Sequence, residues 1–384
     1  MLQSFQWNYY NPTAIFSGRS FPQDLVSYFG KGPILYVTSP GSTQRGVTAD
    51  VEELLQQQGL NYKVLDVASA NPSFEDLRSL PDRLGSFLPE QIIAVGGGSV
   101  LDLAKILSYI LAQNAPSIED ILNLLRAGQS LPSVSPVPVI ACPTTAGTGS
   151  EVTPFATLWD MQEKKKYSVA APNLHPKKAF LFPALTCSLP WTITLSTGLD
   201  ALSQVLESVW NKNYTPLTGV LAIAGARTVL EELPKLRQNP NNVHARAKML
   251  EASLFSGLCI AQTRTAMAHA ISYPLTAHHG TPHGIACSFT LPDLWNYNCT
   301  VDDGRMEQFS SGLGYTKDTF GKELLRFLNA LDFRKEFIKT INSPEQVMTL
   351  SQEMYTPGRA DNNLRSFDDP SLKSFLEQAS RRWI

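Results

Sequence analysis

Histidines concentrate in one short stretch of the sequence, where His269, His278, His279 and His283 account for four of the six in the chain. An isolated histidine is more often structural than a ligand, but clustering favours metal binding. Upstream, Asp200 and Gln204 stand four residues apart in an apolar segment, so a helix there places both on one face. Because a carboxylate and imidazoles suit a divalent transition metal, the two segments together predict a metal site.

A glycine loop follows an expected buried strand over residues 91–95. It reads Gly96-Gly97-Gly98-Ser99 and leads into a helical segment. Ser99 and Asp102 have the spacing of a capping box, which predicts that the helix begins there. Glycines allow close backbone approach, and free N–H groups at a helix start favour a phosphate. A tight turn without a ligand fits three glycines equally well, because the spacing is not GxGxxG.

A second loop, PTTAGTGSEVT over residues 143–153, follows an expected strand that ends at Cys142. Two such loops at the carboxyl ends of strands suit a nucleotide lying along the edge of an open sheet. Together they favour a nucleotide site over two simple turns.

Short β-branched runs alternate with amphipathic stretches in the first half of the chain, which is typical of a parallel sheet with crossover helices. We expect strands at residues 33–38, 62–67, 91–95 and 136–142, and a helix at 47–58. Beyond residue 185 the pattern becomes helical, with long helices expected at 198–210, 219–233 and 243–277. These patterns predict an α/β domain over residues 1–184 and a helical domain over 185–384.

Composition limits the class of protein. The chain has 384 residues, 43% hydrophobic and 17% charged, with net charge −2, which argues against a disordered protein and against a nucleic-acid partner. We expect neither a signal peptide nor a membrane anchor, because the start lacks the required pattern and the longest apolar run is residues 220–226. Five scattered cysteines indicate a reducing, cytoplasmic setting.

Four segments, GGGSVLDLAK, PTTAGTGSEVT, GLDALSQVLE and AMAHAISYPLTAHHGTPHG, resemble the iron-containing (group III) alcohol dehydrogenases in order and separation. The resemblance runs from about Tyr10 to Asn298. It implies an α/β dinucleotide-binding domain with an open, mainly parallel sheet, followed by an all-α domain, as in the dehydroquinate synthase-like architecture. It also implies metal-dependent hydride transfer between NAD(P)H and a small aldehyde or primary alcohol, in a homodimer.

The resemblance implies that one Asp and three His hold the metal, Fe²⁺ first and Zn²⁺ as the alternative. Asp200, His269 and His283 match three of these positions, whereas the remaining one is Gln204. An amide oxygen is a weaker and harder donor than imidazole, so it could complete the site or leave it underfilled. A second departure is Tyr273, where family members carry a histidine that assists proton transfer, and either His278 or His279 could replace that function.

For the cofactor, the resemblance assigns the pyrophosphate to Gly97, Gly98 and Ser99, and the nicotinamide ribose or amide to Asp102. The resemblance also implies that Thr144, Thr145 and Thr148 line the adenosine side of the cofactor and that Lys166 contacts the cofactor. The loop after the first strand carries no carboxylate between residues 38 and 45, whereas Ser39, Ser42 and Thr43 could donate hydrogen bonds to a 2′-phosphate and Arg45 could pair with it. We therefore expect NADP(H) to be accepted, with NAD(H) possible.

Within the family, ESVWNKN and TRTAMAHAISYPL most resemble the branch that reduces phosphonoacetaldehyde to 2-hydroxyethylphosphonate. A phosphonate requires a cation, for which Arg264 and Lys212 are candidates, although an ordinary salt bridge would explain Arg264 as well. The alternatives are a general short-chain alcohol dehydrogenase, an enzyme of the dehydroquinate synthase type, and a metal-free nucleotide-binding protein.

Overall fold

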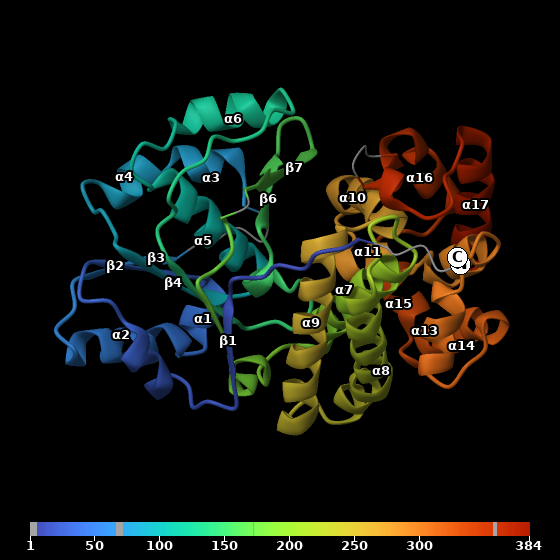
Figure 1. Cartoon of the computed structure of the whole chain (residues 1–384), viewed down its shortest axis with the longest axis horizontal. Helices are drawn as coiled ribbons and strands as arrows, with labels where there is room; N and C mark the ends of the chain where they lie inside the picture. Colours follow the sequence, from blue (N-terminus) through green and yellow to red (C-terminus); the bar gives the residue numbers. More distant parts are fainter. Residues whose placement is uncertain (1–5, 67–71, 172, 356–358) are drawn as a thin grey trace. The chain divides into compact units, whose positions relative to one another are not determined.

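The computed structural model describes residues 6–66, 72–171, 173–355 and 359–384. They form two compact units (Figure 1). The first, which we call the α/β unit, comprises Pro12–Thr145 and Gly149–Ser188. The second, the helical unit, comprises the described residues of Met1–Asn11, Ala146–Thr148 and Leu189–Ile384.

Six parallel strands form the sheet of the α/β unit, in the order β1-β8-β5-β4-β2-β3. They are β1 (Ala14–Ser17), β2 (Ile34–Thr38), β3 (Tyr62–Asp66), β4 (Gln91–Gly96), β5 (Val139–Pro143) and β8 (Lys178–Leu181). A separate antiparallel hairpin consists of β6 (Phe155–Asp160) and β7 (Lys165–Ala170).

Successive side chains of a strand point to opposite faces of a sheet. Because the strands carry apolar residues on both faces, helices cover both faces of this sheet. Leu35 and Val37 of β2 belong to one buried cluster, whereas Ile34 and Tyr36 belong to another. The first cluster includes residues of α3 (Phe74–Arg78), α4 (Leu80–Leu84), α5 (Gly98–Ile110) and α6 (Ile118–Arg126). The second includes residues of the 3-10 helix η1 (Gln23–Tyr28) and of α2 (Val47–Gln57), which follows the short α1 (Pro40–Gln44).

The expected strands and the first expected helix are present, with shifted ends. β5 begins at Val139 rather than at residue 136, because Pro136 and Pro138 have no backbone N–H to donate to a neighbouring strand. The end expected for β3, Val67, lies outside the described residues. The capping box was wrong: α5 begins at Gly98 with Gly97 as N-cap, and no side chain caps it.

The helical unit is built on α7 (Trp191–Val209), α8 (Pro216–Gln238) and α9 (Val243–Thr263). Beyond these lie α10 (Met267–His279), α11 (His283–Ser288), α12 (Leu291–Cys299), α13 (Arg305–Gly312), α14 (Lys317–Ala330), α15 (Phe333–Phe337), α16 (Pro344–Met348) and α17 (Asp369–Arg381). This all-helical second part and the parallel sheet of the first confirm the predicted fold class. Within the described residues, no helix has the length and apolar character needed to cross a membrane.

The single long helix expected over residues 243–277 was wrong, because the structure divides it at Arg264. This residue has a φ of 62°, which a continuous α-helix does not allow. Asn211 and Asn213, which follow α7, donate side-chain N–H groups to the carbonyls of Arg264 and Thr263. These bonds satisfy carbonyls that the end of α9 leaves free, and a new helix then begins at Met267, two residues before His269.

Candidate metal centre and nucleotide loops

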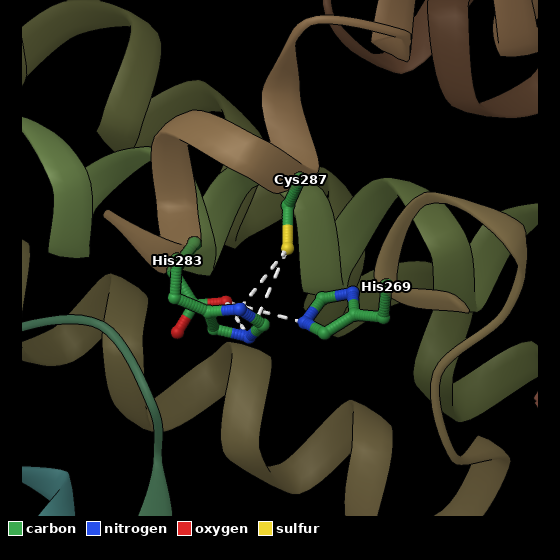
Figure 2. A group of neighbouring side chains, drawn as sticks. His269, His283 and Cys287 are labelled. Carbon is green, nitrogen blue, oxygen red and sulfur yellow. Dashed lines mark hydrogen bonds and ion pairs between the residues drawn. The ribbon is translucent and has the colours of Figure 1, made fainter. Parts of the chain in front are cut away.

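Four potential metal donors converge inside the helical unit. Asp200 lies on α7, His269 on α10, and His283 and Cys287 on α11. One donor atom from each lies within 4.8 Å of the others. Figure 2 shows the side chains of His269, His283 and Cys287 pointing toward one another. The sequence-predicted ligands Asp200, His269 and His283 are therefore brought together, and Cys287 joins them.

The distances between these atoms fit a small metal ion. Asp200 Oδ1 lies 3.2 Å from His269 Nε2 and 4.0 Å from His283 Nε2. Metal bonds of about 2.0–2.3 Å place neighbouring donors roughly 3–4 Å apart in a four- or five-coordinate site. The cluster therefore matches the size of a transition-metal site without a large rearrangement.

A second carboxylate fixes the orientation of His269. Glu207 Oε2 lies 2.6 Å from Nδ1 of His269, and Glu207 Oε1 accepts the backbone N–H of His269 at 3.1 Å. Ser272 Oγ of α10 lies 3.4 Å from Nδ1 of His283, which begins α11. These contacts leave Nε2 of both imidazoles turned toward Asp200, as in metal sites where an outer carboxylate orients a histidine ligand.

The electrostatics of the cluster favour a cation. Asp200 and Glu207 are 3% and 0% exposed, so two carboxylates are withdrawn from water around one imidazole. Burial alone lowers the pKa of His269, but Cys287, Glu207 and the hydrogen bond with Asp200 together raise that pKa well above its usual value. Burial raises the pKa of the Cys287 thiol, and His269 opposes this. A divalent ion would supply the positive charge that a proton on His269 otherwise provides.

Gly284 allows α11 to approach α7 closely enough to place His283 beside Asp200. A Cβ atom at position 284 would lie 1.7 Å from the carbonyl oxygen of Ser196. The backbone N–H of Gly284 instead donates to Ser196 Oγ at 3.2 Å. The glycine after His283 is thus a packing requirement of the cluster.

Gln204 lies one turn after Asp200 on α7 and is 3% exposed. Its Oε1 accepts a hydrogen bond from Ser256 Oγ of α9 at 2.8 Å. The oxygen that the sequence offers as a metal donor therefore contacts the neighbouring helix.

The three candidates for proton transfer occupy different surroundings on α10. Tyr273 stacks on the His283 ring, with 5.9 Å between centroids and an angle of 9°, and lies beside the His269 ring. His278 is exposed and contacts Glu353 at 2.9 Å. His279 is partly buried, and its Nε2 has no hydrogen-bond partner among the described residues. Tyr273 is thus the candidate that contacts the cluster.

The glycine loop of the α/β unit lies where the order of the strands reverses. After β2 the chain forms β3 on one side of β2 and then β4 on the other. The ends of β2 and β4 are joined by the hydrogen bond from Thr38 Oγ1 to the Val95 carbonyl. Ser39 caps α1 directly after β2, and Gly97 precedes α5 directly after β4. This edge is where open α/β sheets bind nucleotides.

The two nucleotide loops contact each other through their backbones and one carboxylate. Thr144 donates its N–H to the Gly96 carbonyl, and a Cβ at Gly97 would lie 3.3 Å from the Thr145 side chain. Asp102 accepts from Ser150 Oγ at 2.5 Å and from the N–H of Thr157 at 2.7 Å. Its carboxylate thus joins α5 to the second loop.

The other predicted nucleotide contacts lie in separate elements. Gly98 and Ser99 form the first turn of α5, and Lys166 lies on the hairpin strand β7. Thr148 belongs to the helical unit, whereas Thr144 and Thr145 belong to the α/β unit.

The structure corrects one point about the loop after β2. Residues 38–45 contain no carboxylate, but Asp66 at the end of β3 reaches the loop and accepts from Thr43 Oγ1 at 3.1 Å. Arg45 also lies there, because its guanidinium would be 3.1 Å from a Cβ at Gly41. A carboxylate and a cation are therefore both available near this loop.

The sequence interpretation missed Glu207 and Cys287. Glu207 stands seven residues after Asp200, two helical turns away on the same face, and Cys287 stands four residues after His283. Helical spacing from the candidate ligands would have indicated both residues.

A parallel sheet with glycine loops at its reversal point, together with a buried carboxylate–imidazole cluster, is typical of a nucleotide-dependent metalloenzyme. Comparison with known families agrees. Residues 12–183 match the family described as iron-containing alcohol dehydrogenase, and residues 194–380 match the C-terminal part of the Fe-containing alcohol dehydrogenase family. The chain belongs to this family, as the sequence motifs predicted, and is an oxidoreductase of alcohols and aldehydes.

Individual relatives agree over most of the chain. It is 32% identical to the phosphonoacetaldehyde reductase of Streptomyces viridochromogenes, covering 80% of each chain. It is also 32% identical to the sulfoacetaldehyde reductase of Bilophila wadsworthia, over 68% of this chain and 66% of that protein. Among solved structures, sulfoacetaldehyde reductase from Bifidobacterium kashiwanohense in complex with NAD⁺ has a TM-score of 0.87 at 30% identity, covering 98% and 99% of the two chains.

Proposed function

We propose that this enzyme reduces phosphonoacetaldehyde to 2-hydroxyethylphosphonate, using NADPH or NADH and a divalent metal. The observation that carries the proposal is the buried donor cluster, found in a chain 32% identical to a phosphonoacetaldehyde reductase over 80% of both lengths. A second relative is named for sulfoacetaldehyde, which is also a two-carbon aldehyde with a tetrahedral anionic group. These two substrates share the chemistry of a small, negatively charged aldehyde.

The donor cluster supports the reduction step. A divalent metal held by Asp200, His269 and His283 would act as a Lewis acid on the aldehyde oxygen, while a nicotinamide supplies the hydride. Glu207 keeps Nε2 of His269 available by engaging Nδ1. We assign the proton that the product alcohol needs to the Tyr273 hydroxyl, because its ring contacts both imidazoles, with His279 as the alternative.

Arg264 is our candidate for recognition of the phosphonate. Burial and the nearby positive charge of Arg359 lower the pKa of Arg264 to about 10. Two guanidinium groups in such surroundings are stabilised by an anion, and a phosphonate offers three acceptor oxygens. Lys212 suits this role less, since its Nζ already donates to the Asp361 carbonyl on the surface.

For the nucleotide, we assign the pyrophosphate to Gly97, Gly98 and Ser99, which begin α5 at the reversal point of the sheet. Arg45 supports acceptance of a 2′-phosphate, whereas Asp66 supports NAD(H). We expect Asp66→Asn to raise the ratio of kcat/KM with NADPH to that with NADH by roughly tenfold. The substitution removes the repulsion between the Asp66 carboxylate and the 2′-phosphate, and about 1.4 kcal/mol of repulsion corresponds to a factor of ten.

The experiment compares kcat/KM for phosphonoacetaldehyde, sulfoacetaldehyde and propanal, with both nucleotides, before and after chelation. Phosphonoacetaldehyde should exceed propanal by about 100-fold or more, the order expected when buried charges lose their partner. Arg264→Met should remove this preference while leaving propanal turnover unchanged. Equal turnover of propanal would indicate a general short-chain alcohol dehydrogenase, and no turnover at all would indicate a metal-free nucleotide-binding protein.

The oligomeric state and the roles of the two domains complete the proposed function. We propose a cytoplasmic homodimer with a nucleotide domain over residues 1–184 and a metal and substrate domain over 185–384. Sedimentation equilibrium tests the dimer, and a monomeric mass at micromolar concentration would contradict it.

A further inference from the structure

We propose that Cys287 supplies the fourth protein donor to the metal, in place of the imidazole that is missing at position 204. The inference rests on the proposed function, which requires a metal at Asp200, His269 and His283. It goes further because it changes the donor set to one carboxylate, two imidazoles and one thiolate.

The position of Cys287 supports this role. It is fully buried on α11, one turn after His283, so that both side chains point to the same side of the helix. The Cys287 sulfur lies 3.8 Å from Nε2 and 3.9 Å from Nδ1 of His283. Bonds of about 2.3 Å to sulfur and 2.0–2.1 Å to nitrogen give a sulfur–nitrogen separation of roughly 3.1–3.8 Å at angles from 90° to 120°.

The surroundings of Gln204 support the exchange of donors. Its amide oxygen accepts from Ser256 Oγ, which lies 2.8 Å from the Ser253 carbonyl and 3.3 Å from the Gly147 carbonyl. Gln204 therefore belongs to a hydrogen-bonded contact between α7, α9 and the loop at Gly147. The Gln204 amide oxygen is therefore engaged by α9. The thiol of Cys287, in contrast, faces the imidazoles directly (Figure 2).

A thiolate donor has chemical consequences. Sulfur is a softer ligand than an amide oxygen or imidazole, so this set should favour Zn²⁺ and Co²⁺ over Mg²⁺ and Mn²⁺. Carboxylate and thiolate together also neutralise the charge of a divalent ion, which reduces the cost of burying it.

Cobalt substitution tests the proposal through a spectroscopic signal that is independent of catalysis. The metal-free full-length protein is titrated with Co²⁺, and bound metal is counted by elemental analysis. A thiolate ligand gives a sulfur-to-cobalt charge-transfer band in the near ultraviolet, which carboxylate, imidazole and amide ligands do not give. We expect this band in the wild type at one cobalt per chain, and also in Gln204→Leu.

Two cysteine variants make the assignment specific. Cys287→Ser should lose the band and bind cobalt more weakly by roughly tenfold or more. Tenfold is the smaller loss of metal affinity typical when a residue that only contacts a metal ligand is replaced, and loss of a direct ligand should cost at least as much. Cys259→Ser is the matched control, because Cys259 is equally buried in the helical unit but lies on α9 beside the Thr218 carbonyl. It should keep the band.

The outcomes distinguish a failure of this inference alone from a failure of the proposed function. A wild-type protein that binds one cobalt without the band overturns the role of Cys287 and leaves the proposed function intact. A band that persists in Cys287→Ser also overturns it. Failure of the wild type to bind any cobalt overturns both the thiolate ligand and the metal-dependent function. The spectrum of the cobalt-loaded wild type alone decides whether a thiolate binds the metal. The proposal therefore stays testable even if Cys287→Ser does not fold.

Discussion

Each unit of the molecule buries a cluster of charged side chains, and the two clusters balance their charge differently. In the α/β unit, Asp102 Oδ1 lies 3.2 Å from Nζ of the fully buried Lys105, whose ammonium also donates to Thr153 Oγ1 at 3.1 Å. In the helical unit, Asp200 and Glu207 share the imidazole of His269. The first cluster contains a lysine, whose pKa is lowered by burial and raised by Asp102, whereas the second contains a group that metal binding must deprotonate.

This difference distinguishes a cluster that holds its own cation from one that a metal ion would complete. The partly buried carboxylate of Asp102 gains a nearby positive charge from the lysine of α5 without any ligand. In the helical unit the donor atoms lie within 4.8 Å of one another, so a metal ion bound among them would complete the charge balance. Burial of charge alone therefore does not indicate a metal site, whereas the geometry and the kind of partner do.

The largest effect on the helical cluster is expected from Gly284→Ala. The added Cβ would lie 1.7 Å from the Ser196 carbonyl, so α11 must move away from α7 and carry His283 with it. We expect metal binding and aldehyde reduction to fall by at least roughly 100-fold, while nucleotide affinity stays unchanged.

Equilibrium dialysis with Zn²⁺ and nucleotide fluorescence titration measure the two properties separately. Gly30→Ala is the control, because a Cβ there would have its nearest neighbour at 3.8 Å. Normal metal affinity in Gly284→Ala would show that α11 tolerates displacement without loss of the cluster.

Removing the internal cation should cause the next largest effect, on stability. Lys105→Met leaves Asp102 without its ion pair, although the bonds from Ser150 and Thr157 remain. Loss of one partner of a buried pair costs about 3–5 kcal/mol in the free energy of unfolding. Urea denaturation of the metal-free protein measures the loss, and the exposed Lys165→Met should show little change. A small effect in both variants would mean that the hydrogen bonds from Ser150 and Thr157 suffice to stabilise the charge of Asp102.

Sequence reasoning located the glycine loops better than the metal donors, and the reason is physical. Gly97 and Ser39 act within continuous segments, where a strand, a loop and a helix start follow one another in the chain. Cys287 and Glu207 share helix faces with His283 and Asp200, which helical spacing indicates, but their convergence depends on the packing of α7 against α10 and α11, which no local pattern encodes. The break at Arg264 was missed for the same reason, because the amides that stabilise it come from Asn211 and Asn213, about fifty residues earlier.

Glu151 offers a test of how poorly the α/β cluster tolerates a second carboxylate. It is 1% exposed, and its Oε1 has no hydrogen-bond partner among the residues that the structure describes. Burial raises the pKa of Glu151 from 4.5 to about 7, with Lys105 opposing the shift. Between these pH values the folded protein holds a proton that the unfolded chain has lost, so stability falls as the pH rises from 4.5 to 7.

Glu151→Gln removes this titration, so its stability advantage over the wild type should grow as the pH rises from 4.5 to 7 and be complete above that range. We expect little difference from the wild type at pH 4 and a gain of about 3 kcal/mol in the free energy of unfolding at pH 8. Denaturation curves at the two pH values measure it, with the exposed Glu53→Gln as the control. A gain that is equal at both pH values would attribute the effect to packing instead of to ionisation.

The smallest effect is expected from Glu207→Gln, which changes only how the helical cluster orients one ligand. An amide in this position can still contact Nδ1 of His269, but it no longer carries the charge that favours a donor N–H there and strengthens Nε2 as a ligand. Metal affinity should fall by about 10–100-fold, with unchanged nucleotide affinity and with activity restored by excess metal. Competition with a chromogenic chelator measures the affinity, and Glu251→Gln on α9, which removes a surface pair with Lys248, is the control. Unchanged metal affinity would mean that Glu207 is not needed to orient His269 and that its contact with Nδ1 serves only the packing of the helical unit.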